Sequence, residues 1–230
     1  MNMKKLAMMA VALTATLTMS AQHEPGTFSI QPKLGGVGAM LSNMPDMDFG
    51  SVNGADIKLD KNAVGGGLIG AEFEYQLTNT FSLAAGLNYS QQGSAWKDFD
   101  EIINGANVKI KDTKVVLGYI NLPVVVNAYL FRGFAVKTGV QFGYLTNANV
   151  ETTVSATQGD FTNKLEFDKS IRSECEKLDI SIPVGISYEF KVPIVIDARY
   201  NIGLTKVNKD DDEKAKNQVF QITVGYKFEL

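Results

Sequence analysis

The chain has 230 residues, of which 45% are hydrophobic and 20% charged, and its formal net charge is −3. This length suits one large domain or two small ones, and a mildly acidic chain without a basic cluster is not built to bind nucleic acid. Cys175 is the only cysteine, which excludes an intramolecular disulfide and a CxxC metal site.

Residues 1–21 have the pattern of a secretory signal peptide. Two lysines precede an apolar run from Leu6 to Met19, and small residues follow that suit cleavage after Ala21. The run is shorter than the roughly 20 apolar residues of a spanning helix, which disfavours an N-terminal membrane anchor. Cleavage would remove two lysines and no acid, so the net charge would change from −3 to −5. We therefore expect a signal peptide over 1–21 and a single mature domain over 22–230.

Beyond residue 27 the dominant period is two residues, which is the side-chain period of a β-strand. In each segment, apolar residues alternate with polar or small ones, and the first segment fits least well. No later run of 18 apolar residues suggests a membrane helix. Each segment has about the length that a tilted membrane strand needs. The eight segments are 28–37, 69–77, 81–89, 120–130, 134–142, 180–190, 194–204 and 220–230.

The connections between these segments alternate strictly between short and long. Hairpin turns are expected at 78–80, 132–133 and around 191–193. The other four connections are long and polar and cover roughly 42–63, 91–113, 146–177 and 206–217. In a closed antiparallel barrel this alternation places all tight turns at one end and all long loops at the other.

The polarity of the two strand faces separates a membrane barrel from a water-soluble one. A lipocalin-type barrel would keep its apolar residues inside. Here the apolar face is almost free of charge, and a charge on a lipid-facing surface costs about 2–4 kcal/mol at most. The charges lie on the opposite face, at Lys33, Glu72, Glu74, Lys137, Asp179, Asp197, Arg199, Lys227 and Glu229. The sequence therefore predicts an all-β fold, an eight-stranded antiparallel transmembrane β-barrel of the outer-membrane type.

Aromatic residues are expected to form two belts, as at the two interfaces of a bilayer. The belt near the turns contains Phe28, Tyr75, Phe81, Tyr129, Phe131, Phe134, Tyr188, Phe190, Tyr226 and Phe228. The sparser belt near the loops contains Tyr89, Tyr119, Phe142 and Tyr144.

Several strand and turn motifs resemble the outer-membrane β-barrel domain family of Bacteroidota, often called PorT-like. The motifs are FSLAAGLNYSQQG (Phe81–Gly93), YINLPVVVNAYL (Tyr119–Leu130), AVKTGVQFGYL (Ala135–Leu145), IDARYNIGLTKV (Ile196–Val207) and VFQITVGYKFEL (Val219–Leu230). They cover nearly all of the expected mature chain. The resemblance implies fold and location and hardly any activity, although the named member is implicated in protein secretion across the outer membrane. The last strand is also similar to the terminal signal of the barrel-assembly machinery, with Leu230 in place of the usual aromatic residue.

Five charged residues of one face form the candidate site. They are Glu72, Glu74, Lys137, Asp197 and Arg199. We expect them to form a structural network of salt bridges, because an eight-stranded barrel is too narrow for an open channel. The alternative is a path for protons or ions.

Three other features have weaker functional interpretations. The acidic run Asp210–Glu213 could bind Ca²⁺, but it lacks the alternating ligand spacing of a calcium loop and is expected to be solvated. Cys175 is expected to be inert, with a reactive thiol as the alternative. An enzyme is disfavoured because the only histidine, His23, precedes the first strand. We expect no catalytic residue, cofactor or metal.

Three functions remain open. The first is a structural or binding barrel that acts through long extracellular loops, the second is a PorT-like component of a secretion or envelope assembly, and the third is a small channel. The expected partners are outer-membrane lipid, the barrel-assembly machinery and an extracellular or secretion-system protein, with both termini in the periplasm.

Overall fold

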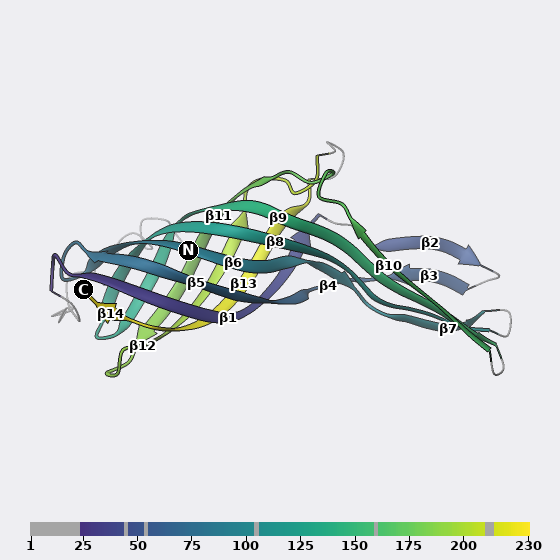
Figure 1. Ribbon diagram of the computed structural model, residues 1–230, viewed down its shortest axis with the longest axis horizontal. Coiled ribbons are helices and arrows are strands. Elements are labelled where there is room, and N and C mark those ends of the chain that lie inside the picture. The colour runs from purple at the N-terminus through teal and green to yellow at the C-terminus, as the bar shows by residue number, and fades with distance from the viewer. Residues whose placement is uncertain (1–23, 44–45, 53–54, 104–105, 159–160, 210–213) are drawn as a thin grey trace, which may run out of the picture.

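In the computed structural model, eight long antiparallel strands close into a ring (Figure 1). The structure describes residues 24–43, 46–52, 55–103, 106–158, 161–209 and 214–230, so the expected signal peptide, His23 and the whole acidic run at 210–213 lie outside the described residues. The strands of the ring are β1 (Phe28–Ser42), β5 (Val64–Gln76), β6 (Phe81–Trp96), β8 (Ala106–Phe131), β9 (Phe134–Gln158), β11 (Leu178–Glu189), β12 (Ile194–Gly203) and β13 (Lys216–Tyr226). The predicted fold class is confirmed.

Strand β1 closes the ring by pairing on both sides. It pairs with β5 through twelve residue pairs and with β13 through ten, from Lys33 opposite Gly225 to Ser42 opposite Lys216. A short strand, β14 (Phe228–Glu229), extends this closure on the other side of Lys227. Full closure leaves no unpaired backbone edge in the ring, which is a requirement for strands that cross a bilayer.

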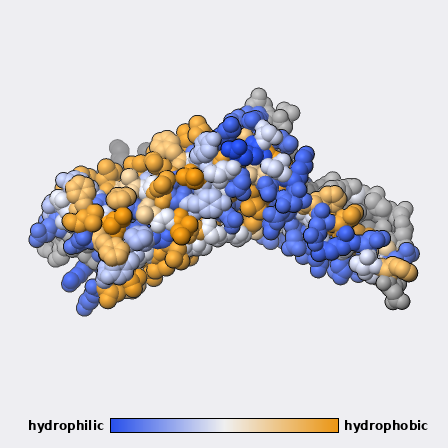
Figure 2. Space-filling model, viewed as in Figure 1, coloured by the Kyte–Doolittle hydropathy of each residue, from blue (hydrophilic) through white to orange (hydrophobic). Residues whose placement is uncertain are grey.

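The strands alternate between buried polar residues and exposed apolar ones. In β13, for example, Phe220 and Ile222 are exposed, whereas Gln221 and Thr223 are buried. The apolar residues cover the outside of the barrel half of the molecule, and hydrophilic residues cover much of its other half (Figure 2). The predicted polarity is confirmed, and it is the reverse of a lipocalin-type barrel.

Aromatic side chains at the turn end lie in pairs, and all the paired residues are exposed except Phe134, which is half-buried. Four pairs of rings have centroids 4.5–4.9 Å apart. The pairs are Phe28 with Tyr75, Phe131 with Phe134, Tyr188 with Phe190, and Tyr226 with Phe228. Two of the predicted belt residues, Tyr119 and Tyr129, are instead buried inside the barrel. Both have odd numbers in a strand whose odd-numbered residues point inward, and their assignment to the belts is wrong.

The three predicted tight turns are present, but the four long connections are not simply loops. Strands β8 and β9 contain 26 and 25 residues, and their paired extensions continue beyond the loop end of the barrel (Figure 1). The connections also contain β2 (Met47–Val52), β3 (Ala55–Leu59), β4 (Lys61–Asn62), β7 (Phe99–Ile103) and β10 (Phe161–Ser170). Their polar composition indicated loops, and β10 is exposed to solvent along its whole length. Among the described residues, no helix is long and apolar enough to cross a membrane.

Candidate functional site

The centre of the barrel lumen near the turn end is filled by a cluster of five charged residues. Arg199 of β12 lies between two carboxylates, with Nη2 2.7 Å from Glu72 Oε2 and Nε 2.8 Å from Asp197 Oδ1. Lys33 Nζ lies 2.6 Å from Glu72 Oε2, and Lys137 Nζ lies 2.8 Å from Asp197 Oδ2 and 3.5 Å from Glu72 Oε1. All five side chains are at most 4% exposed. We call this group the central cluster.

Glycines on neighbouring strands make room for the long side chains of the central cluster. The opposed pairs are Lys33 with Gly70 and Gly225, Glu72 with Gly86, and Lys137 and Arg199 with Gly185. At Gly185, an added Cβ would lie 2.5 Å from the Ala198 carbonyl oxygen and 2.8 Å from Arg199 Cγ. The register of the strands therefore matches large charged residues with residues that have no side chain.

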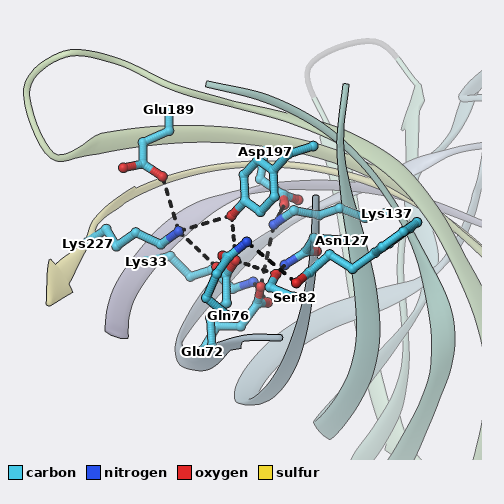
Figure 3. Close-up of polar contacts among 12 residues, drawn as sticks. Lys33, Glu72, Gln76, Ser82, Asn127, Lys137, Glu189, Asp197 and Lys227 are labelled. Atoms are coloured by element: carbon cyan, nitrogen blue, oxygen red, sulfur yellow. Dashed lines mark hydrogen bonds and ion pairs between the residues drawn. The ribbon is translucent and has the colours of Figure 1, made fainter. Parts of the chain in front are cut away.

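A second group of charges lies beside the central cluster, and we call it the end cluster (Figure 3). Lys227 Nζ lies 2.9 Å from Glu74 Oε2 and 3.1 Å from Glu189 Oε2. The Tyr129 hydroxyl donates a hydrogen bond to Glu74, and Ser82 Oγ donates another at 2.5 Å. The central cluster has one more cation than carboxylates and the end cluster has one fewer, so together they are neutral.

The structure divides the five predicted site residues between these clusters. Glu72, Lys137, Asp197 and Arg199 are in contact with one another, whereas Glu74 belongs to the end cluster. Sequence reasoning left out Lys33, Lys227 and Glu189 as members of the site. All three lie on the same strand face as the predicted five, so the alternation would have found them.

From the charged clusters toward the loop end, the lumen first contains asparagine side chains and then an apolar core. Asn121 Nδ2 donates to Asn88 Oδ1 at 3.1 Å and to Ser90 Oγ at 2.9 Å. Toward the loop end the interior becomes apolar, and we call this group the outer core. It consists of Leu41, Leu59, Trp96, Phe99, Val115, Leu117, Tyr119, Leu145, Ala148, Cys175, Val207 and Ala215. The long connections are therefore packed on a core of their own.

Cys175 is part of the outer core and only 4% exposed. Burial raises the pKa of its thiol above the ordinary value. A thiol that is buried and protonated is a poor nucleophile. This environment favours the inert interpretation of Cys175.

Beyond the outer core, strands β10, β9, β8 and β7 form a four-stranded arm with two different faces. One row across the arm is apolar and runs from Leu165 through Val154 and Ile110 to Phe99. The other face has charged pairs such as Lys109 with Asp100, 2.8 Å apart, and Lys164 with Glu166, 2.5 Å apart. The apolar row is buried at its β7 end, where Phe99 joins the outer core, and exposed at its β10 end.

Strand β10 is an edge strand of the arm. It pairs with β9 along all ten of its residues, and it is the terminal strand of its sheet. All ten residues are exposed, including Phe161, Leu165 and Phe167. An edge of this kind presents unpaired N–H and C=O groups to other chains.

The lumen charges are directed at one another, and the described part of the chain has no group of three His, Cys, Asp or Glu residues that could hold a metal ion. The arrangement instead provides a filled lumen and an exposed sheet.

Comparison with known proteins gives one family match. The sequence profile of the family described as "Outer membrane protein beta-barrel domain" matches residues 20–209. Comparison with curated protein sequences gave no match.

Several solved barrels are similar to this chain. Ail, the attachment invasion locus protein of Yersinia pestis, solved in complex with a heparin analogue, is 13% identical, with a TM-score of 0.41 over 89% of this chain and 99% of that chain. Neisserial surface protein A is 15% identical, with a TM-score of 0.42 over 87% and 97% of the two chains. The N-terminal barrel domain of OprF from Pseudomonas aeruginosa is 13% identical, with a TM-score of 0.34 over 90% and 100%.

Proposed function

Because the chain belongs to the outer-membrane protein β-barrel domain family, we propose that it is a closed barrel that holds a rigid binding platform outside the bacterial outer membrane. The observation that carries this proposal is the contrast between the two ends. The lumen is filled by ion pairs among side chains that are at most 8% exposed. The arm, in contrast, displays a ten-residue edge strand that is exposed throughout. In this function the barrel is an anchor and the partner is a protein.

The proposed orientation places the arm outside the cell and the tight turns in the periplasm. In outer-membrane barrels the periplasmic turns are short and the extracellular loops are long. The C-terminal strand and the start of β1 lie at the turn end, where the Leu230 N–H donates to the Phe28 carbonyl. In this orientation both termini face the periplasm, outer-membrane lipid surrounds the barrel, and the barrel-assembly machinery inserts it.

Cysteine labelling on intact cells tests this orientation. In a Cys175→Ala background, Asn163→Cys on β10 should react with a maleimide carried by a polymer too large to cross the outer membrane. The matched control, Lys191→Cys in a turn, should react only after the membrane is permeabilised. The opposite pattern would contradict the proposal.

A small channel is a less favoured function because the two clusters occupy the lumen. In planar bilayers the wild-type protein should give no steady single-channel currents. Reproducible currents from the purified wild-type barrel would support the channel instead.

A PorT-like role in a secretion or envelope assembly is the second proposed function. It is favoured by the strand and turn motifs that resemble that family. It differs from the first in its partner, which would be a component of the secretion machinery. Crosslinking in native membranes separates the two functions, because crosslinks from turn residues such as Lys191 would join periplasmic components, whereas crosslinks from Asn163 would join extracellular ones. A catalytic role is not part of either proposal.

A further inference from the structure

Strand β10 has a sequence that is complementary to itself. When two copies pair antiparallel with Leu165 opposite Leu165, Lys164 of each copy lies opposite Glu166 of the other. The other opposed pairs are Thr162 with Asp168, Asn163 with Phe167, and Phe161 with Lys169. In this register no residue faces a like charge, and directly opposed residues share a face and interact most strongly.

The two registers in which an adjacent residue, Glu166 or Lys164, lies at the centre of the strand pair are less favourable. With Glu166 at the centre, two carboxylates from the two copies lie opposite each other. With Lys164 at the centre, two ammonium groups do so. Like charges directly opposite one another destabilise a pair of strands, so the alternation of charge selects the register centred on Leu165.

Edge strands in natural proteins are commonly blunted by lysine, proline or short length. Strand β10 has ten residues and no proline, and its two lysines are balanced by two carboxylates. Lys164 is already paired with Glu166 at 2.5 Å, so this edge has no net charge to repel another strand. The other edge strand of the arm, β7, has only five residues and carries two adjacent acids, Asp100 and Glu101.

We propose that the partner of the arm is a second copy of this protein, joined by antiparallel pairing of the two β10 strands in the register centred on Leu165. This proposal rests on the proposed function and names its partner. The added strand would extend the sheet from four strands to eight through backbone hydrogen bonds, with side chains setting the register. The exposed Leu165 side chains would pack on each other across the two-fold axis.

The geometry of this pairing places the two barrels in facing membranes. The two-fold axis of an antiparallel strand pair is perpendicular to the sheet, and the arm continues away from the loop end of the barrel (Figure 1). A rotation about that axis moves the second barrel to the opposite end of the joined arms. The pairing would therefore connect two cells or vesicles that display the protein.

Charge-reversal variants of β10, assayed alone and mixed with each other, test both the identity of the partner and the register of the strand pair. Two populations of proteoliposomes with different fluorophores are mixed and their co-clustering is measured. Wild-type vesicles should cluster. The extent of co-clustering should fall at least about tenfold for Lys164→Glu vesicles and for Glu166→Lys vesicles, because the residues that face each other across the two strands then carry charges of the same sign. Mixing the two variants should restore clustering, since each acid then faces a lysine. The double variant K164E/E166K should also cluster with itself, which the register centred on Glu166 does not allow.

Disulfide trapping gives an independent measurement. In a Cys175→Ala background, Leu165→Cys should form a dimer when oxygen with a copper catalyst oxidises the two thiols, since opposed Cβ atoms lie about 4.5–5.5 Å apart. The matched control is Asn163→Cys on the same face. In this register the two Asn163 positions are offset by roughly 13 Å along the strands, too far for a disulfide.

Each outcome decides the inference. Clustering that the single reversals do not weaken, mixing that does not restore it, or equal crosslinking at 163 and 165 would overturn it. So would wild-type vesicles that fail to cluster while their barrels migrate as folded on gels. The proposed function fails separately, if Asn163→Cys is not labelled on intact cells.

Discussion

Arg199 is a buried cation whose two carboxylate partners come from different places in the chain. Glu72 lies on β5, and Asp197 lies two residues away on β12. The strand face of each residue could be predicted from parity alone. The contact between β5 and β12 could not, because it crosses the lumen and depends on the closure of the ring.

Replacing Arg199 with alanine should destabilise the barrel strongly. Removal of one member of a buried ion pair leaves an uncompensated charge and costs on the order of 3–5 kcal/mol. The midpoint of unfolding in urea, followed by gel shift in lipid, should therefore fall clearly. Lys97→Ala is the control, because it breaks an exposed 3.2 Å pair with Asp60 and should cost at most about 1 kcal/mol. Equal midpoints would mean that Arg199 is solvated.

Cys175 should react slowly while the protein is folded. The raised pKa means that the folded state keeps the thiol protonated, and the thiolate is the reactive form. With mildly alkaline buffer, maleimide labelling should be about tenfold slower, or more, in the folded protein than in urea. The unfolded thiol ionises first as the pH rises, so this group lowers the stability only above its unfolded pKa. Equal labelling rates in the two states would show that the outer core is open.

At the scale of elements, alternation predicted the strands inside the membrane well and those outside it poorly. Inside, one face must be apolar, so a period of two residues is visible in segments such as 194–204. In β10, every residue is exposed, and the face that carries Phe161, Leu165 and Phe167 also carries Asn163 and Lys169. The hydrophobic pattern that identifies a strand is weak where lipid and a buried core are both absent. The outer core was missed for a related reason, since more than half of its members, such as Leu59 and Val207, lie in connections that were expected to be loops.

Adding a single methyl group at a glycine that lies opposite a large charged residue of the lumen should lower the stability of the barrel. Gly185→Ala would place a Cβ 2.5 Å from the Ala198 carbonyl oxygen, so β11 and β12 would have to separate. We expect a loss of about 1–3 kcal/mol in urea unfolding. Gly36→Ala is the matched control on β1, because its Cβ would have no atom within 4 Å, and it should change the stability by about 0.5 kcal/mol or less. A larger effect at Gly36 than at Gly185 would contradict this account of the lumen.

At the scale of the whole molecule, the closed ring and the outer core are two separately packed regions. The ring has an exposed apolar outer face and buried charged clusters, whereas the outer core is a cluster of buried apolar side chains at the loop end. We expect the two regions to unfold with different sensitivity to their surroundings.

The barrel should show heat-modifiable mobility. Unheated samples in detergent should migrate differently from boiled samples, because the closed ring stays folded, and circular dichroism should show β-structure. Recovery of the mature protein in the soluble periplasmic fraction would contradict a membrane barrel.

Trp96 is the only tryptophan of the chain, and it lies in the outer core with 4% of its surface exposed. Its indole fluorescence is therefore an optical signal from the extramembrane half of the molecule, with no contribution from a second tryptophan in the barrel. Emission shifted to shorter wavelength would report a packed platform, while mobility on gels reports the ring. The two signals recorded on one sample would reveal the order in which the halves assemble, and whether a platform can be damaged while its anchor survives.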